Sequence, residues 1–341
     1  MGLLRRSPWS PQLQRMVTRL VGRLPYAEAS EVLEELSQIR LAPSSGWHMG
    51  QDWGARIQQE LAGEEAAQKA AAREWSTPGG RPDAQQRMGV AVDGAMLYIL
   101  GEGWKECKLG AVFKVVLKKR RDEVTGDEGE YGHAEDISYV GHLGGPEALG
   151  WRVWAEAHRR GWQKACATQM LGDGAPWIWG LHQEHFHTSV AGVDWWHAVE
   201  HLGEAKLLLY PQGGPTGSRW YNENQTALFQ GHAERIARSL QASADQEEDP
   251  VRAKELRKAG AYFRNNRDRM QYQDMRDDGW LIGSGAVESG AKQFKARFTG
   301  PGMRWSRQGA ENLLPVRAAI MTGKARFDEL WSRAYANLPP S

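Results

Sequence analysis

The sequence predicts an α/β fold in which helices flank a mixed sheet, a small helical domain precedes the sheet and a helical insertion interrupts the sheet-bearing region. Three observations lead to this fold class. Apolar runs of strand length lie between residues 88 and 193, apolar residues recur at helical spacing before residue 73, and residues 203–280 are polar and charged without a strand pattern. A chain of 341 residues is long enough to bury a sizeable core.

The first part of the chain, residues 1–73, is expected to be helical. Its apolar residues recur every three or four positions in two stretches, namely Leu13, Met16, Val17 and Leu20, and then Ala29, Val32, Leu33 and Leu36. Short helices of this kind fit a DNA-binding helix-turn-helix and many unrelated bundles, so both interpretations stay open. Residues 74–87, rich in glycine, proline and charge, predict a linker.

The sheet is expected within residues 88–202. Apolar runs predict strands at residues 88–94, 108–119 and 136–144, helical spacing predicts a helix at 146–161, and a further strand follows within 163–174. A short strand then turns into a helix near Trp195. Residues 203–280 are the helical insertion, and residues 281–341 supply the C-terminal helices of the same core.

Composition limits the classes of partner. Lys+Arg 43 against Asp+Glu 42 gives a net charge of +1, so nucleic-acid binding has to come from local basic patches. Two cysteines cannot build a disulfide framework, which suits a reducing compartment. No stretch approaches the roughly 18 consecutive apolar residues of a membrane span. These features predict a cytoplasmic protein without a membrane partner.

Three acidic residues stand in positions that favour a shared site. Asp93 and Asp173 each end an apolar run and are followed by glycine, and the carboxyl ends of strands in α/β sheets face the ligand crevice. Glu288 follows a glycine-rich turn in the first turns of a predicted helix, with Ser284 as candidate N-cap. An ordinary Asp-Gly turn and a solvated helix face are the competing interpretations.

Three converging carboxylates repel one another unless cations lie between them. Oxygen ligands select Mg²⁺ or Mn²⁺, and two such ions would serve an in-line phosphoryl displacement. The basic residues after the acid, Lys292, Lys295 and Arg297, would then lie alongside phosphates. We therefore expect a two-metal site that acts on a polyanion.

Several motifs resemble those of one family. They are VDG at 92–94, WKECKLGAVF at 104–113, DGAPWIW at 173–179, VDWWHAVEHL at 193–202, IGSGAVES at 282–289, GMRWS at 302–306 and RFDELW at 326–331. Their order resembles that of bacterial insertion-sequence transposases of the ISKra type, over about residues 8–333. That family belongs to the DDE transposases, which have an RNase H-like fold and are related to the Mutator-like transposases.

The resemblance implies metal-dependent DNA strand cleavage and strand transfer at insertion-sequence ends. It implies a catalytic and metal-binding triad of Asp93, Asp173 and Glu288, with Asp194 and His197 as an accessory D-x-x-H pair near the second acid. The implied partners are double-stranded DNA, as inverted-repeat ends and as target, and further copies of the chain in a homodimer or higher oligomer. The expected location is the bacterial nucleoid.

Further DNA contacts and two other functions stay open. Arg304 and Trp305 in the glycine-rich GPGMRWS segment are candidate DNA contacts. Because family members usually carry a longer N-terminal region, a truncated DNA-binding remnant or repressor of transposition is one alternative. A zinc hydrolase is the other, since the histidine-rich segment from His182 to His201 offers ligands: Asp194, His197 and His201 with His185 or His187.

Overall fold

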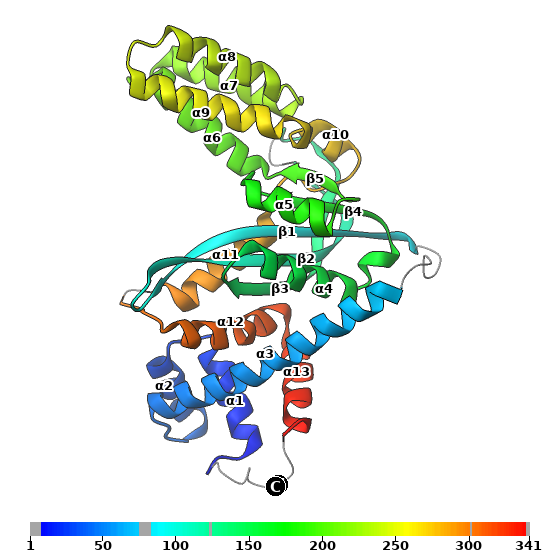
Figure 1. Cartoon of the computed structure of the whole chain (residues 1–341), viewed down its shortest axis with the longest axis vertical. Helices are drawn as coiled ribbons and strands as arrows, with labels where there is room; N and C mark the ends of the chain where they lie inside the picture. The colour runs from blue at the N-terminus through cyan, green and yellow to red at the C-terminus, as the bar shows by residue number, and fades with distance from the viewer. Residues whose placement is uncertain (1–7, 75–82, 123–124, 301, 339–341) are drawn as a thin grey trace.

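The computed structural model describes residues 8–74, 83–122, 125–300 and 302–338. The molecule is elongated, with three regions stacked along its long axis (Figure 1). Helices α1–α3, α12 and α13 lie at one end, the sheet lies in the middle, and α6–α9 extend from the other end. No helix in the described residues is long and apolar enough to cross a membrane.

A five-stranded mixed sheet forms the centre of the molecule. Its strands are β1 (Asp83–Ile99), β2 (Gly103–Arg121), β3 (Glu128–Leu143), β4 (Ala165–Gly172) and β5 (Val190–Val193). The spatial order is β3-β2-β1-β4-β5, with β1, β2 and β3 antiparallel and β1, β4 and β5 parallel. The predicted mixed α/β sheet with flanking helices and an N-terminal helical region is confirmed.

Helices make up most of the remainder. They are α1 (Pro11–Val21), α2 (Tyr26–Ser37), α3 (Pro43–Glu74), α4 (Pro146–Arg159), α5 (Pro176–His185), α6 (Trp195–Leu209), α7 (Pro215–Phe229), α8 (Ala233–Gln246), α9 (Pro250–Asn266), α10 (Tyr272–Asp277), α11 (Gly285–Phe298), α12 (Arg307–Thr322) and α13 (Lys324–Ala336). Two short 3₁₀ turns, η1 (Trp162–Lys164) and η2 (Arg267–Arg269), complete the described elements. Many of the helices begin with proline, whose fixed φ suits the first helical position.

The two faces of the sheet are buried by different helices. On one face, α4 packs so closely that a Cβ at Gly110 of β2 would lie 2.4 Å from Val153. On the other face, α11 packs Phe294 against Gly141 of β3, and α12 lies beside it. The apolar core on the α11 side continues into α3 and α13, whereas α1, α2 and the start of α3 share a smaller core.

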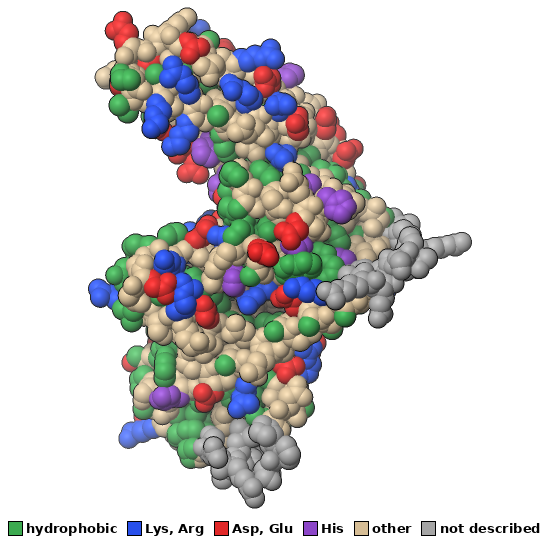
Figure 2. Space-filling view, viewed as in Figure 1, with side chains coloured by type: hydrophobic (Ala, Val, Ile, Leu, Met, Phe, Trp, Pro, Cys, Tyr) green, Lys and Arg blue, Asp and Glu red, His purple; other side chains and the backbone are tan. Residues whose placement is uncertain are grey.

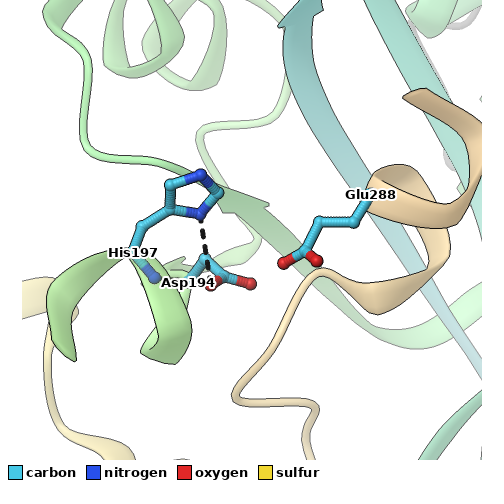
Figure 3. Close-up of side chains that lie close together, drawn as sticks. All are labelled: Asp194, His197 and Glu288. Atoms are coloured by element: carbon cyan, nitrogen blue, oxygen red, sulfur yellow. Dashed lines mark hydrogen bonds and ion pairs between the residues drawn. The ribbon is translucent and has the colours of Figure 1, made fainter. Parts of the chain in front are cut away.

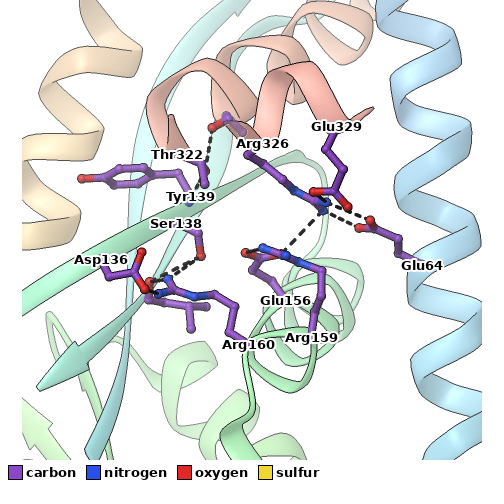
Figure 4. Close-up of polar contacts among 12 residues, drawn as sticks. Glu64, Asp136, Ser138, Tyr139, Glu156, Arg159, Arg160, Thr322, Arg326 and Glu329 are labelled. Atoms are coloured by element: carbon purple, nitrogen blue, oxygen red, sulfur yellow. Dashed lines mark hydrogen bonds and ion pairs between the residues drawn. The ribbon is translucent and has the colours of Figure 1, made fainter. Parts of the chain in front are cut away.

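A network of charged side chains joins α3, α4 and α13 (Figure 4). Arg326 of α13 donates to Glu64 of α3 and to Glu329, and it lies 3.8 Å from Glu156 of α4. Because Arg326 is largely buried, each carboxylate offsets part of the cost of removing its charge from water. The N-terminal helices are therefore bonded to the sheet-bearing part of the chain.

Two sequence predictions about β1 are wrong. Both ends of the expected linker at 74–87 belong to regular elements, since α3 ends at Glu74 and β1 begins at Asp83, and residues 75–82 lie outside the described residues. Arg87 pairs with Val115 on one side and Ala167 on the other, and its guanidinium stacks 3.8 Å above the Trp280 ring. Sheet pairing from two neighbours thus overrides the polar composition of the segment.

The second error concerns the end of this strand. β1 does not stop at Asp93 but continues to Ile99, paired throughout with β2. What ends near Asp93 is the pairing with β4, whose last partner pair is Ala91 with Leu171.

Residues 203–280 contain no strand among the described elements. They comprise the end of α6, then α7–α9, η2 and α10. Helices α7–α9 project away from the sheet, whereas α10 lies beside it (Figure 1). Helix α6 runs across the expected boundary at residue 203 without a break. Lys and Arg side chains are interspersed with acids over this helical region (Figure 2).

Candidate metal centre

Asp93 and Asp173 occupy equivalent positions just beyond the parallel pairing of β1 with β4. Ala91 and Leu171 are the last partners of the parallel pair β1 and β4, and each acid lies two residues further along its strand direction. Parallel strands in register place equivalent residues side by side. The pattern of an apolar run ending in Asp-Gly thus leads to neighbouring acids on adjacent strands.

The loop of Asp173 is fixed by local and distant hydrogen bonds. Its Oδ1 accepts from the Ala175 backbone N–H at 2.7 Å, at the start of α5. Its backbone carbonyl accepts from the Tyr262 hydroxyl at 3.0 Å, from α9 of the insertion. Asn266, one turn later in α9, accepts from Trp179 Nε1 of α5 at 2.8 Å. The insertion is therefore bonded to the backbone of the second acid and to the helix that follows it.

Asp93 is half-buried beside other charged groups. Burial raises the pKa of its carboxyl, and the negative charge of Asp173 raises it further. The Gly94 backbone N–H, which donates to Asp93 Oδ1 at 2.6 Å, and the charges of His197 and Lys295 act in the opposite direction. A carboxylate in this setting gains from a bound cation.

Glu288 lies in the first turn of α11 and faces the same hollow as Asp93. Burial raises the pKa of its carboxyl, and the charges of Asp194 and Asp93 add to that rise. The hollow has a volume of about 420 Å³, and its lining includes Asp93, His197, Glu288, Lys292 and Lys295. A lining that combines carboxylates with ammonium groups suits an anionic ligand held through cations.

Asp194 is a buried anchor between α6 and α11 (Figure 3). Its Oδ1 accepts from the His197 backbone N–H at 3.0 Å, and its Oδ2 accepts from the Ser284 backbone N–H. Burial by itself raises the pKa of Asp194, but the hydrogen bonds from His197 and Ser284 lower it below its usual value. This carboxylate fixes the glycine turn that precedes Glu288.

His197 completes the group. Its Nδ1 lies 3.2 Å from Asp194 Oδ1, and this contact, helped by the charges of Asp173 and Asp93, raises the pKa of His197 to about 9. One ligand atom each from Asp194, His197 and Glu288 lie within 4.8 Å of one another, the grouping that the described residues offer to a metal (Figure 3). Among the described residues, Asp93 and Asp173 do not belong to this group.

The zinc ligands of the alternative interpretation are not brought together. His201 Nδ1 lies 3.0 Å from Glu204, and its ring packs 3.9 Å from that of Tyr262. His185 is buried with its ring 4.6 Å from Trp151. Among the described residues, neither His185 nor His201 joins Asp194 and His197 in a candidate metal group.

The predicted DNA contacts divide by burial. Lys292, Lys295 and Arg304 are exposed and remain available, the two lysines at the hollow and Arg304 beside the Tyr98 ring. Arg297 and Trp305 are buried, so the structure contradicts their assignment to DNA.

The buried pair has a structural role. Arg297 lies on the inward face of α11, where its Nε donates to the Val21 carbonyl at 2.7 Å. Trp305 Nε1 donates to the Phe298 carbonyl at 2.8 Å, and the Arg297 guanidinium lies 5.1 Å from the Trp305 ring. The basic composition of α11 does not reveal which of its cations points inward.

The sequence did not predict the hydrogen bonds that fix the candidate site from distant segments of the chain. Tyr262 and Asn266 lie in a polar, charged insertion, and no local pattern marks them as partners of the second acid. The bond from Ser284 to Asp194 spans 90 positions of sequence. The glycine-rich turn before Glu288 indicated an unusual backbone conformation, but it did not indicate that the Asp194 carboxylate would accept a hydrogen bond from that turn.

Comparison with known proteins gives one family. A model of the uncharacterised protein family UPF0236 matches residues 158–334, just over half of the chain. The matched stretch contains Asp173, Asp194, His197 and Glu288, and Asp93 precedes it. No curated protein matches the chain.

Proposed function

The chain belongs to the uncharacterised protein family UPF0236, and we propose that it is a DDE-type transposase of the ISKra type, which cleaves DNA strands at insertion-sequence ends and joins them to a target. The single observation that carries this proposal is the arrangement of the acids. Asp93 and Asp173 occupy equivalent positions two residues beyond the last paired residues of β1 and β4, and Asp93 and Glu288 line one hollow, Glu288 from the first turn of α11.

The residues fit two Mg²⁺ or Mn²⁺ ions. The pKa values of Asp93 and Glu288 are raised by burial and by neighbouring carboxylates, the electrostatic situation that divalent cations relieve. Asp93, Asp173 and Glu288 would hold them. When bound, such ions activate the attacking oxygen and stabilise the leaving oxygen of a phosphoryl transfer.

The other residues of the hollow act on the substrate. Lys292 and Lys295 are exposed on α11, one turn and two turns after Glu288, and bind phosphates of the DNA backbone. His197, protonated at neutral pH through its contact with Asp194, donates a hydrogen bond to a phosphate oxygen and offsets the charge of Asp173. Arg304 extends the basic surface beyond the hollow.

The partners follow from this activity. Duplex DNA carrying terminal inverted repeats and a target duplex are the substrates, and a homodimer or higher oligomer brings two ends together. A DNA-binding remnant or repressor of transposition is the second candidate. It shares the exposed lysines and Arg304 with the transposase, so only a cleavage assay separates the two.

Glu288→Gln tests the proposal. The substitution keeps the shape of the side chain but removes the charge that holds a cation, so magnesium-dependent cleavage of DNA with the inverted repeats that flank the gene should fall about 100-fold or more. End binding in the absence of metal should persist. Glu28→Gln, at an exposed position in the first turn of α2, is the matched control and should cleave like wild type.

Lys295→Ala tests the binding half separately. It should weaken end binding and reduce the slope of log affinity against log salt by about 0.9, the loss of one phosphate contact. Cleavage by Glu288→Gln at a rate near wild type would refute the assignment of the acids. Absence of cleavage by wild type, with end binding retained, would favour the repressor.

A further inference from the structure

A second hollow adjoins the candidate metal centre. It has a volume of about 400 Å³ and lies between the start of α11 and the strands β2 and β3. Trp196 lines both hollows, so the two hollows meet at this residue. The side chain is 44% exposed, whereas its neighbour Trp195 is buried in the core.

The lining combines an aromatic surface with polar groups. Ile137, Tyr139 and Ile282 supply apolar surface, and His133 and Ser289 supply donors and acceptors. The indole of Trp196 is bounded by the glycine turn, because a Cβ at Gly283 would lie 3.4 Å from its Cδ1.

The polar groups of the second hollow can form hydrogen bonds with a neutral heterocycle. Burial, with the nearby charges of Lys118 and Arg120, lowers the pKa of His133, so its ring is neutral near pH 7 and offers one donor and one acceptor. Ser289 is exposed at the second turn of α11 and offers a hydroxyl. A flat ring with hydrogen-bonding edges therefore suits this hollow better than an aliphatic chain.

We propose that the second hollow binds one unpaired nucleobase, stacked on Trp196, from the DNA strand whose phosphate lies at the carboxylates. This inference rests on the proposed function. Because both hollows include Trp196, a nucleotide next to that phosphate can reach the second hollow. Removing a base from a duplex costs a few kcal/mol and costs least at a strand end or a mismatch. Stacking on an aromatic side chain repays part of that cost.

A double-mutant cycle between protein and DNA tests the proposal. End binding is measured without divalent metal for wild type and Trp196→Ala, each with intact DNA ends and with ends carrying a single abasic nucleotide, scanned across the cleavage junction. Trp196→Ala should weaken binding of intact ends about 5- to 150-fold, the range for loss of one stacked base. At one abasic position the two changes should be non-additive, because either removes the same contact.

Two further variants exclude a folding effect. Trp196→Phe keeps an aromatic face and should restore most of the lost affinity. Trp104→Ala removes a tryptophan that is 62% exposed at the start of β2, and it should be additive with every abasic position. Additivity of Trp196→Ala at all positions, or equal behaviour of Trp196→Ala and Trp104→Ala, would overturn the proposal.

The outcomes separate this inference from the proposed function. If wild type binds and cleaves ends but shows no coupling at any position, the base-binding site is wrong and the transposase assignment stands. If wild type neither binds nor cleaves DNA ends, the proposed function fails and the base-binding site fails with it.

Discussion

Replacing Arg297 by methionine tests whether this cation is a structural anchor. The side chain is 1% exposed, and its Nε donates to the Val21 carbonyl at the end of α1. Its guanidinium lies 5.0 Å from the Tyr26 ring and 5.1 Å from the Trp305 ring. Methionine has a similar length and fills much of the same space, but it neither donates a hydrogen bond nor carries a charge.

Opposing effects set the magnitude. A hydrogen bond from a charged group contributes about 1.5–3 kcal/mol, and a desolvated cation over aromatic rings contributes up to about 2 kcal/mol. Against this, methionine avoids the burial of a charge, a cost that also lowers the pKa of Arg297. In the variant, the Val21 carbonyl receives no hydrogen bond from residue 297. We therefore expect the lost hydrogen bond and ring contacts to outweigh the avoided burial of a charge, and the free energy of unfolding to fall by about 2 kcal/mol.

Equilibrium urea unfolding measures the effect, with Lys295→Met as the matched control. Lys295 lies two residues away on the same helix but is exposed, so its replacement should change stability by less than about 0.5 kcal/mol. The salt dependence of DNA binding should show the reverse pattern, flattened in Lys295→Met and unchanged in Arg297→Met. Equal unfolding midpoints for the two variants would refute the anchor role.

Two further predictions concern the helices and the response to acid. In α3, Gly54→Ala should lower the free energy of unfolding by about 3 kcal/mol, because its Cβ would lie 2.1 Å from the Asn312 carbonyl oxygen. Gly63→Ala, whose Cβ would have no atom within 4 Å, should raise the free energy of unfolding by up to about 1 kcal/mol. Similar urea midpoints for the two variants would contradict this prediction. Burial lowers the pKa values of His142 and His158 from 6.5 to about 4. As the pH drops, these histidines therefore take up protons in the unfolded chain before they do so in the folded chain. The free energy of unfolding should fall between about pH 6.5 and pH 4, by about 2 kcal/mol per histidine. His158→Gln should reduce that fall in urea unfolding at pH 7 and pH 4.5, and an unchanged fall would show that other groups cause it.

The sequence predicts the acids better than their surroundings. An apolar run ending in Asp-Gly depends only on local chemistry, and it located Asp93 and Asp173 on adjacent strands. The length of β1 was not predictable from the same pattern, since pairing with β2 carries the strand past Asp93 to Ile99. Burial of Arg297 depends on a carbonyl 276 positions away, and charge alone favours the surface.

The local sequence pattern also does not predict hydrogen bonds between side chains and backbone of distant segments. Asp194 belongs to a D-x-x-H pair, which suggested an accessory role, but its bond to the Ser284 backbone follows from the packing of α6 against the turn before α11. The insertion was expected from its polar, helix-forming composition. Its contacts with the loop of Asp173 depend on how α9 lies across α5, which composition does not encode.

Two hydrogen bonds from α9 connect the insertion to the second acid and to the helix that follows it. The Tyr262 hydroxyl donates to the Asp173 carbonyl, and Asn266 accepts from Trp179 Nε1, so the loop after β4 and the helix α5 that follows it are each bonded to α9. Asp93, by contrast, is positioned by its pairing within the sheet. The place of the second acid relative to the first therefore depends on a helix that carries none of the three carboxylates.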